Sequence, residues 1–228
     1  MELDTIEKKI NWEEYYSDSF NWENANYSIL PLTDEFIKEF AAKINWYRIS
    51  ESVKLDEDFI RKYKDYVHWS AICKYQRLSE IFLEEFKDKV DWKFVSHYQS
   101  LSYNFVIKFK NKIDWEMIFY YHPINCHYID ELISKYNILE HEPNKSGIWM
   151  GISAYQHLEE WFVDKYRYNL NALSIFSYQK LSEEKFKELL LDTKFTKNIT
   201  ITRCAQTLLK KNTIGFSKEF IIWLHKYM

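Results

Sequence analysis

The residue types best suited to chemistry lie close together near the middle of this sequence. His122, Cys126 and His127 fall within six residues, and imidazole nitrogen and thiolate sulfur are ligands that zinc prefers in proteins. A C-x-x-C pair is missing from the sequence, and His141 is the plausible fourth ligand nearby. We therefore expect no metal site, and a zinc-dependent enzyme built on the first three residues ranks third among the functional hypotheses.

Other catalytic patterns are missing from the sequence as well. It contains no glycine-rich phosphate-binding loop, no G-x-S-x-G nucleophile motif and no H-E-x-x-H zinc motif. The acid pairs Glu84-Glu85 and Glu183-Glu184 fall at surface positions of predicted helices, where solvated carboxylates are ordinary. We predict that the protein is not an enzyme, needs no cofactor and has no small-molecule substrate, so that its function is binding.

Composition indicates a helical protein with a sizeable core. Of 228 residues, 46% are hydrophobic and 19% aromatic, while Gly and Pro number only three each. So few turn-forming residues argue against an all-β fold and favour helices. The opening MELDTIEKK lacks the apolar stretch of a signal peptide, and no run approaches the ~18 apolar residues of a membrane span, so we expect a cytoplasmic protein. We interpret the odd cysteine count as reduced thiols, at Cys73, Cys126 and Cys204.

A fixed period organises the chain. Tryptophan returns every 23 residues, at Trp46, Trp69, Trp92 and Trp115. Trp149 resumes the pattern after 34 residues, Ala172 holds the same place 23 residues later, and Trp22 precedes the series by 24. The phrase W-x-x-[IV]-x-x-Y-Q-x-L-S-E-x-F is complete at residues 69–82. It resembles short helical repeats of uncharacterised proteins of large DNA viruses and phages, which implies an accessory protein that acts in a host cytoplasm.

Each repeat predicts two short helices that must pack on neighbouring repeats. With the Trp position as phase zero, Asn or Asp before it and Ser ten residues after it are helix N-caps, as at Asp91 and Ser102. Apolar residues at helical spacing give each helix one buried face. The sequence therefore predicts an all-α solenoid of about eight helix-turn-helix repeats of ~23 residues. We assign one domain over 1–228, with regular repeats at 22–138 and 149–190, an insertion loop at 139–148 and a degenerate, basic C-terminal cap at 191–228.

A Tyr-Gln pair recurs at phases +6 and +7. The glutamines are Gln76, Gln99, Gln156, Gln179 and Gln206, and His122 takes this place in its repeat. One glutamine per repeat could read RNA bases, but reading residues vary along such arrays and this residue is nearly constant. We therefore predict that Gln hydrogen-bonds backbone groups at the joint between helices, and that the Tyr rings before it pack against the core.

Residues away from the predicted core face are candidates for binding. We expect phases +1, +2, +4 and +5 of the first helix to be exposed, which in two adjacent repeats would produce an apolar ridge. The predicted partner-binding residues are Phe94, His97, Met117, Phe119 and Tyr120. Burial under the insertion at 139–148 is an equal alternative. The leading hypothesis is a repeat scaffold that binds a host or viral protein, plausibly inhibiting a host defence factor.

Charge supports a second hypothesis. The net charge is −3, yet residues 171–228 hold 10 Lys and Arg against 5 Asp and Glu, which leaves 21 against 29 in residues 1–170. A basic end could contact RNA or single-stranded DNA, directly or through the partner. The predicted contacts are Lys194, Lys197, Arg203, Lys210 and Lys211.

Overall fold

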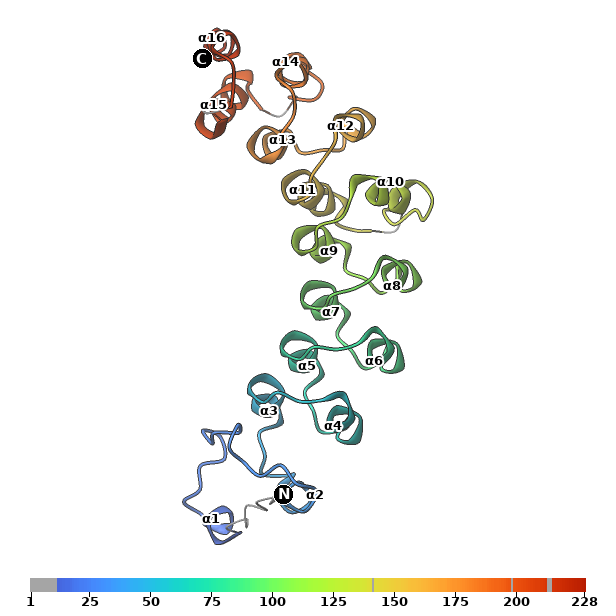
Figure 1. The fold of residues 1–228 in the computed structure, drawn as a ribbon, viewed down its shortest axis with the longest axis vertical. Coiled ribbons are helices and arrows are strands. Elements are labelled where there is room, and N and C mark those ends of the chain that lie inside the picture. The colour runs from blue at the N-terminus through green and yellow to red at the C-terminus, as the bar shows by residue number, and fades with distance from the viewer. Residues whose placement is uncertain (1–11, 141, 198, 213–214) are drawn as a thin grey trace, which may run out of the picture. The chain divides into compact units, whose positions relative to one another are not determined.

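The computed structural model describes residues 12–140, 142–197, 199–212 and 215–228 (Figure 1). These ranges contain sixteen helices and no strand, and neighbouring helices pack in sequence order. The prediction of an all-α repeat solenoid is confirmed. The chain divides into two compact units, Met1–Leu101 and Ser102–Met228.

The first unit contains helices of about two turns each. They are α1 (Trp12–Tyr16), α2 (Asp34–Phe40), α3 (Trp46–Ser52), α4 (Glu57–Lys62), α5 (Trp69–Tyr75), α6 (Glu80–Glu85) and α7 (Trp92–Tyr98). Helices α3, α5 and α7 pack successively and form one layer, while α4 and α6 lie in a second layer (Figure 1). Each repeat thus contributes one helix to each layer.

The second unit continues the same alternation. Its helices are α8 (Tyr103–Lys108), α9 (Trp115–Tyr121), α10 (Cys126–Ser134), α11 (Lys145–Tyr155), α12 (Glu160–Tyr166), α13 (Ala172–Tyr178), α14 (Glu183–Leu191), α15 (Ile201–Asn212) and α16 (Lys218–His225). Within this unit, helices α9, α11, α13 and α15 pack successively and form one layer, and α8, α10, α12 and α14 form another (Figure 1).

The predicted N-caps are confirmed. The side chain of Asp91 accepts hydrogen bonds from the backbone N–H groups of Lys93 and Phe94, and Ser102 accepts from Phe105. Caps of the same kind start both helices in most repeats, because a short polar side chain satisfies an N–H group that has no partner within the helix. The first-helix caps include Asn45, His68, Asp114 and Asn171, and the second-helix caps include Thr33, Asp56, Ser79, Ser182 and Ser217.

The repeated tryptophans join consecutive helices within the scaffold. The indole N–H of Trp69 donates to the carbonyl of Lys64 at 3.0 Å, and that of Trp92 donates to Lys87 at 2.9 Å. Trp46 and Trp115 repeat the bond to the carbonyl five residues earlier. Each indole N–H thereby provides a hydrogen bond to a backbone carbonyl in the turn after the preceding helix, so the tryptophans are structural.

The glutamines at phase +7 are buried and connect each repeat to the one before it. In the second unit, the Gln179 amide donates to the carbonyls of Ser153 and Gln156 at 2.8 and 2.7 Å and accepts from the Leu158 N–H at 3.0 Å. Gln76, Gln99 and Gln156 make the same three bonds. The prediction of a structural joint is confirmed for these four residues.

The predicted joint at Gln206 is wrong. Gln206 is exposed on α15, which is a continuous 12-residue helix. In the regular repeats the chain leaves the helix at phase +7, so that the glutamine turns inward. Here the helix continues past that phase and directs the side chain to solvent.

Two other expectations differ from the structure. Trp22 begins no helix, and residues 22–30 form bends and turns, although Asn21 accepts from the N–H of Asn24 as the cap residues do. The insertion predicted as a loop over 139–148 ends earlier, since residues 145–148 form the first turn of α11. The cap at Asn144 starts this longer helix by accepting from Gly147.

The cysteines and the apolar character of the helices were also considered in the sequence. Cys73, Cys126 and Cys204 are free and buried, and burial raises the pKa of the Cys73 thiol to about 12 and that of Cys204 to about 11. Among the described helices, none combines the length and the apolar character that crossing a bilayer requires.

Candidate functional site

The residue at phase +4 is part of the core, which corrects the predicted exposure of Phe119. Phe119 is completely buried in α9, and Ser50, Cys73, Ser96, Ser153 and Phe176 are buried at the same phase. This position faces the first helix of the following repeat: the backbone N–H of Asn171 donates to Ser153 at 2.9 Å. A Cβ atom added to Gly151 of α11 would lie only 3.3 Å from that of Phe119. Phe119 therefore contributes to stability and is removed from the predicted binding residues.

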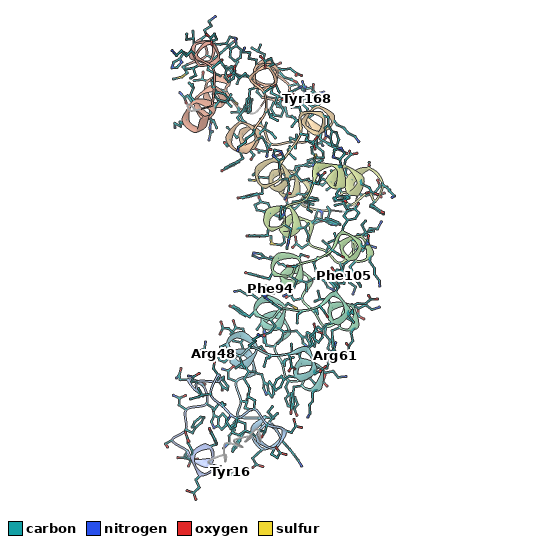
Figure 2. The ribbon with its side chains drawn as sticks, in the orientation of Figure 1. Tyr16, Arg48, Arg61, Phe94, Phe105 and Tyr168 are labelled. Atoms are coloured by element: carbon teal, nitrogen blue, oxygen red, sulfur yellow. The ribbon has the colours of Figure 1, made fainter. Side chains whose placement is uncertain are left out.

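In the first unit, Phe94 and His97 lie on α7, in the layer of first helices, and both are partly exposed (Figure 2). Their rings contact Tyr98, with centroids 6.0 Å and 3.8 Å from the Tyr98 ring. Tyr98 itself is 41% exposed. The three rings form a small aromatic patch that packing leaves accessible.

In the second unit, Met117 and Tyr120 are partly exposed on α9. Tyr120 packs against Gly151 and lies 4.8 Å from the ring of Tyr155 on α11. The aromatic contact then continues to Tyr178 on α13, whose ring is stacked at 6.5 Å from Tyr155. The predicted residue Tyr120 is thus one end of a longer aromatic surface.

Tyr155 and Tyr178 belong to a set of tyrosines at phase +6, one phase later than Tyr120, which the sequence reasoning had assigned to packing. Each is the last residue of a first helix and is 41–59% exposed. We call them the tyrosine row: Tyr75 and Tyr98 in the first unit, and Tyr121, Tyr155 and Tyr178 in the second. The buried glutamine that follows four of the five tyrosines was the available signal, because adjacent residues at a helix end rarely point the same way.

The predicted nucleic-acid residues gather loosely near the C-terminus. Lys194, Lys197, Arg203 and Lys210 are exposed, whereas the side chain of Lys211 lies outside the described part of α15. Lys194 and Lys197 line a pocket of about 220 Å³ together with Tyr168. The Lys194 ammonium lies 4.1 Å from the centre of the Tyr168 ring.

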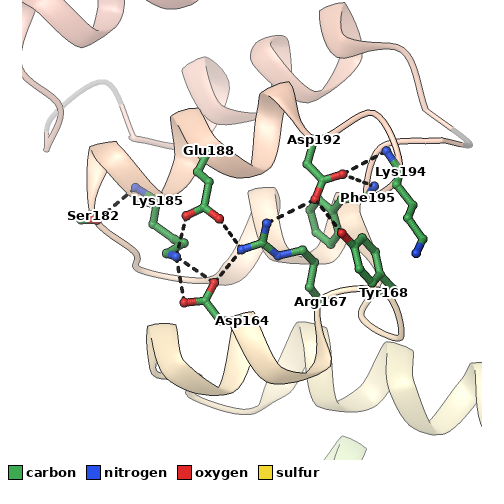
Figure 3. Close-up of polar contacts among 9 residues, drawn as sticks. All are labelled: Asp164, Arg167, Tyr168, Ser182, Lys185, Glu188, Asp192, Lys194 and Phe195. Atoms are coloured by element: carbon green, nitrogen blue, oxygen red, sulfur yellow. Dashed lines mark hydrogen bonds and ion pairs between the residues drawn. The ribbon is translucent and has the colours of Figure 1, made fainter.

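A cluster of ion pairs around the largely buried side chains of Arg167 and Lys185 joins α12 to α14 near this basic region (Figure 3). Arg167 binds Asp164 at 2.7 Å and Asp192 at 3.2 Å and also pairs with Glu188. Lys185 binds Asp164 at 2.8 Å and Glu188 at 2.6 Å. Because both cations are largely buried and already paired with carboxylates, we assign them to the scaffold.

This cluster predicts a loss of stability in acid. Burial opposes ionisation of Asp164, but hydrogen bonds from Lys185 and Arg167 lower its pKa below the ordinary value of 3.8, and the same donors lower that of Glu188 below 4.5. A lowered folded pKa stabilises the protein fully above pH ~5, and the stabilisation disappears as the pH falls through these values. Urea unfolding between pH 7 and 3.5 should show this decline. Arg167→Gln should flatten it, and an unchanged profile in that variant would contradict the assignment.

The residues that were weighed as metal ligands are only partly brought together. Cys126 and His127 open α10, and the thiol of Cys126 donates to Glu159 Oε1 at 3.1 Å. His127 Nδ1 lies 3.7 Å from the same oxygen and 3.9 Å from Cys126 Sγ. His122 is instead the C-cap of α9, and its carbonyl accepts from Gln156; His141 lies outside the described residues. Sequence reasoning missed Glu159, which is 33 residues from Cys126.

Electrostatics at this second cluster favour a charged carboxylate beside a neutral thiol. Burial and the contact with Glu159 raise the pKa of Cys126. The hydrogen bonds from Cys126 and Trp161 lower the pKa of Glu159. The group is therefore one anion with a thiol and an imidazole beside it.

No family model matches the chain, and neither the curated proteins nor the solved structures gave a match to it. The structure by itself defines an all-α helical-repeat protein.

Proposed function

We propose that this protein is a non-enzymatic repeat scaffold that binds a protein partner through the tyrosine row and the aromatic residues beside it. The observation that carries the proposal is the recurrence of an exposed tyrosine at one phase of five repeats. The core is formed at other phases, because the residues at phases +3 and +4 of these five repeats are all buried. Because the core does not require a tyrosine at this phase, its repeated exposure supports a role in contacting a partner.

Tyrosine suits a protein interface for physical reasons. Its ring offers a large contact area with few torsions to immobilise, and its hydroxyl can hydrogen-bond at the rim. In the second unit, Tyr120, Tyr155 and Tyr178 follow one another with ring centroids 4.8 and 6.5 Å apart. In the first unit, Lys74 lies over the rings of Tyr75 and Tyr98, at 4.7 and 5.7 Å. Each unit therefore offers an aromatic strip.

We place this protein in a virus or phage, and the proposed partner is a cytoplasmic protein of the infected host cell, such as a defence factor. This part of the proposal follows from the resemblance of the repeats to those of large DNA viruses and phages. The net charge of −3 and the excess of acidic residues in positions 1–170 favour a protein over a nucleic acid.

The test is an affinity capture in which only the tyrosine row is changed. We expect the double variant Tyr155→Ala/Tyr178→Ala to lose a partner that the unchanged chain holds stoichiometrically, with binding weakened about 30-fold or more, as for interface hot spots. Captured proteins would be identified by mass spectrometry and their affinity measured by surface plasmon resonance.

The matched control is Tyr128→Ala. Tyr128 is 50% exposed in the same unit but lies on α10, in the other layer, so its loss should leave capture unchanged. Circular dichroism would verify that all variants stay folded. Binding that survives the double variant, or that disappears with the control, would refute the proposal.

The alternative function is binding of RNA or single-stranded DNA by the basic end. An exposed ring under a cation, as in Tyr168 with Lys194, is an arrangement on which an unpaired base can stack. The same capture decides between the two functions. Nucleic-acid binding would be abolished by nuclease and would weaken steeply between 50 and 200 mM salt. A protein partner held by the tyrosine row would resist both.

A further inference from the structure

We propose that Cys126, His127 and Glu159 form a zinc site that fastens α10 to α12. Two of the ligands come from the first turn of α10 and the third from the residue that precedes α12. The proposed ion is coordinated by one sulfur, one nitrogen and one carboxylate oxygen, with water as its fourth ligand. This site does not depend on the tyrosine row, which lies at the ends of first helices.

The spacing of the three ligand atoms fits tetrahedral zinc. With Zn–S bonds of about 2.3 Å and Zn–N and Zn–O bonds of about 2.0–2.1 Å, tetrahedral ligand atoms lie about 3.3–3.6 Å apart. The corresponding separations here are 3.1 Å for sulfur to oxygen, 3.7 Å for nitrogen to oxygen and 3.9 Å for sulfur to nitrogen. Shifts of a few tenths of an ångström in surface side chains would bring all three within bonding distance of one ion.

The surroundings hold two of the ligands in place. The indole N–H of Trp161 donates to Glu159 Oε2 at 3.1 Å and leaves Oε1 facing Cys126 and His127. The Trp161 ring also packs on the His127 ring, with centroids 4.7 Å apart. Asn125 Oδ1 accepts from the backbone N–H of His127 at 2.8 Å and also lies 3.2 Å from His127 Nδ1, a contact that zinc would replace. Such contacts around the ligands are typical of metal sites, because they fix the ligand orientation before the ion arrives.

Glu159 departs from the pattern of the other second-helix caps. The N-cap side chain of every other second helix accepts a hydrogen bond from its own helix, but Glu159 makes no such bond. At three other places the first residue of a second helix is a glutamate that accepts from the next cap serine, as Glu57 does from Ser79, Glu160 from Ser182 and Glu183 from Ser217. At this junction Cys126 stands at the first helical position, His127 follows it, and the glutamate is the cap residue Glu159.

Without a metal, the same cluster would be a reversed version of that Glu–Ser contact, in which the thiol donates to the carboxylate. The metal-free cluster and the zinc site differ in the role of His127 and in whether the Cys126 thiol keeps its proton. In the free protein the Cys126 thiol donates its proton to Glu159 Oε1 at 3.1 Å. Zinc would displace that proton and bind the thiolate, which is detectable with a spectroscopic substitute.

The experiment uses the full chain, stripped with a chelator and titrated with Zn²⁺ alone by calorimetry. We expect one zinc per chain and a zinc-dependent rise in the melting temperature. Titration with Co²⁺ should produce the near-ultraviolet thiolate-to-metal absorption of a bound cysteine. Cys126→Ser should abolish that absorption and weaken zinc binding roughly 100-fold or more, beyond the usual cost of changing a residue around the ligands.

Two further variants keep the test decisive. Glu159→Ser removes a ligand while restoring the serine cap of the other repeats, so it should fold well and yet lose zinc. His122→Gln changes a histidine four residues from Cys126 to the glutamine usual at its phase, and should bind zinc normally. Absence of stoichiometric zinc, or zinc binding that persists in Glu159→Ser, would overturn the proposal.

Discussion

Gln179→Ala is expected to lower the free energy of unfolding by about 3–5 kcal/mol, because it leaves three backbone groups without partners. The Gln179 side chain is buried and binds the carbonyls of Ser153 and Gln156 and the N–H of Leu158. Each unsatisfied buried polar group costs about 1–3 kcal/mol, and the alanine methyl can replace none of the bonds. Urea unfolding followed by circular dichroism would measure the change.

Gln206→Ala is the matched control for that substitution. Gln206 occupies the same phase of the last, irregular repeat but is exposed on α15, so its replacement should change stability by no more than about 0.5 kcal/mol. Equal effects in the two variants would show that the buried bonds contribute little.

Phe119→Ala is expected to cost about 3–5 kcal/mol of stability, the range for emptying a phenylalanine site in a packed core. Its side chain is fully buried against α11, where Gly151 allows the helix backbone to approach. The cavity cannot collapse easily, because the glutamine bonds from Gln156 to the carbonyls of Phe119 and His122 hold α9 in place. Chemical denaturation at several temperatures would give the cost.

Tyr121→Ala serves as the control, since Tyr121 is two residues further along α9 and is 53% exposed. We expect a change in stability near 0.5 kcal/mol from this variant. The pair separates scaffold from surface: any binding lost in Phe119→Ala would follow from unfolding, whereas binding lost in tyrosine-row variants would not. A Phe119→Ala protein as stable as the unchanged chain would contradict the buried position.

The candidate site was predictable only in part. Phe94, His97, Met117 and Tyr120 were correctly placed at partly exposed positions by their departure from the repeat. Phe119 was not, because phase +4 lies off the face that packs within a repeat yet on the face that meets the next one. The tyrosine row was missed for the opposite reason: a recurring aromatic residue suggests a core, but here the ring is directed to solvent at the end of each first helix.

The sequence by itself determined the period, the helix pair in each repeat, most of the caps and the glutamine joints. These features depend on contacts a few residues apart or on identical contacts repeated every 23 residues, so spacing and residue type suffice to define them. Only the tertiary structure decided which side of each helix meets the next repeat, and thereby buried Phe119 and exposed Tyr155. It also brought Glu159 to Cys126 and His127. The rotation of one helix pair on the next sets these positions, and that rotation depends on side-chain packing between repeats that no local pattern encodes.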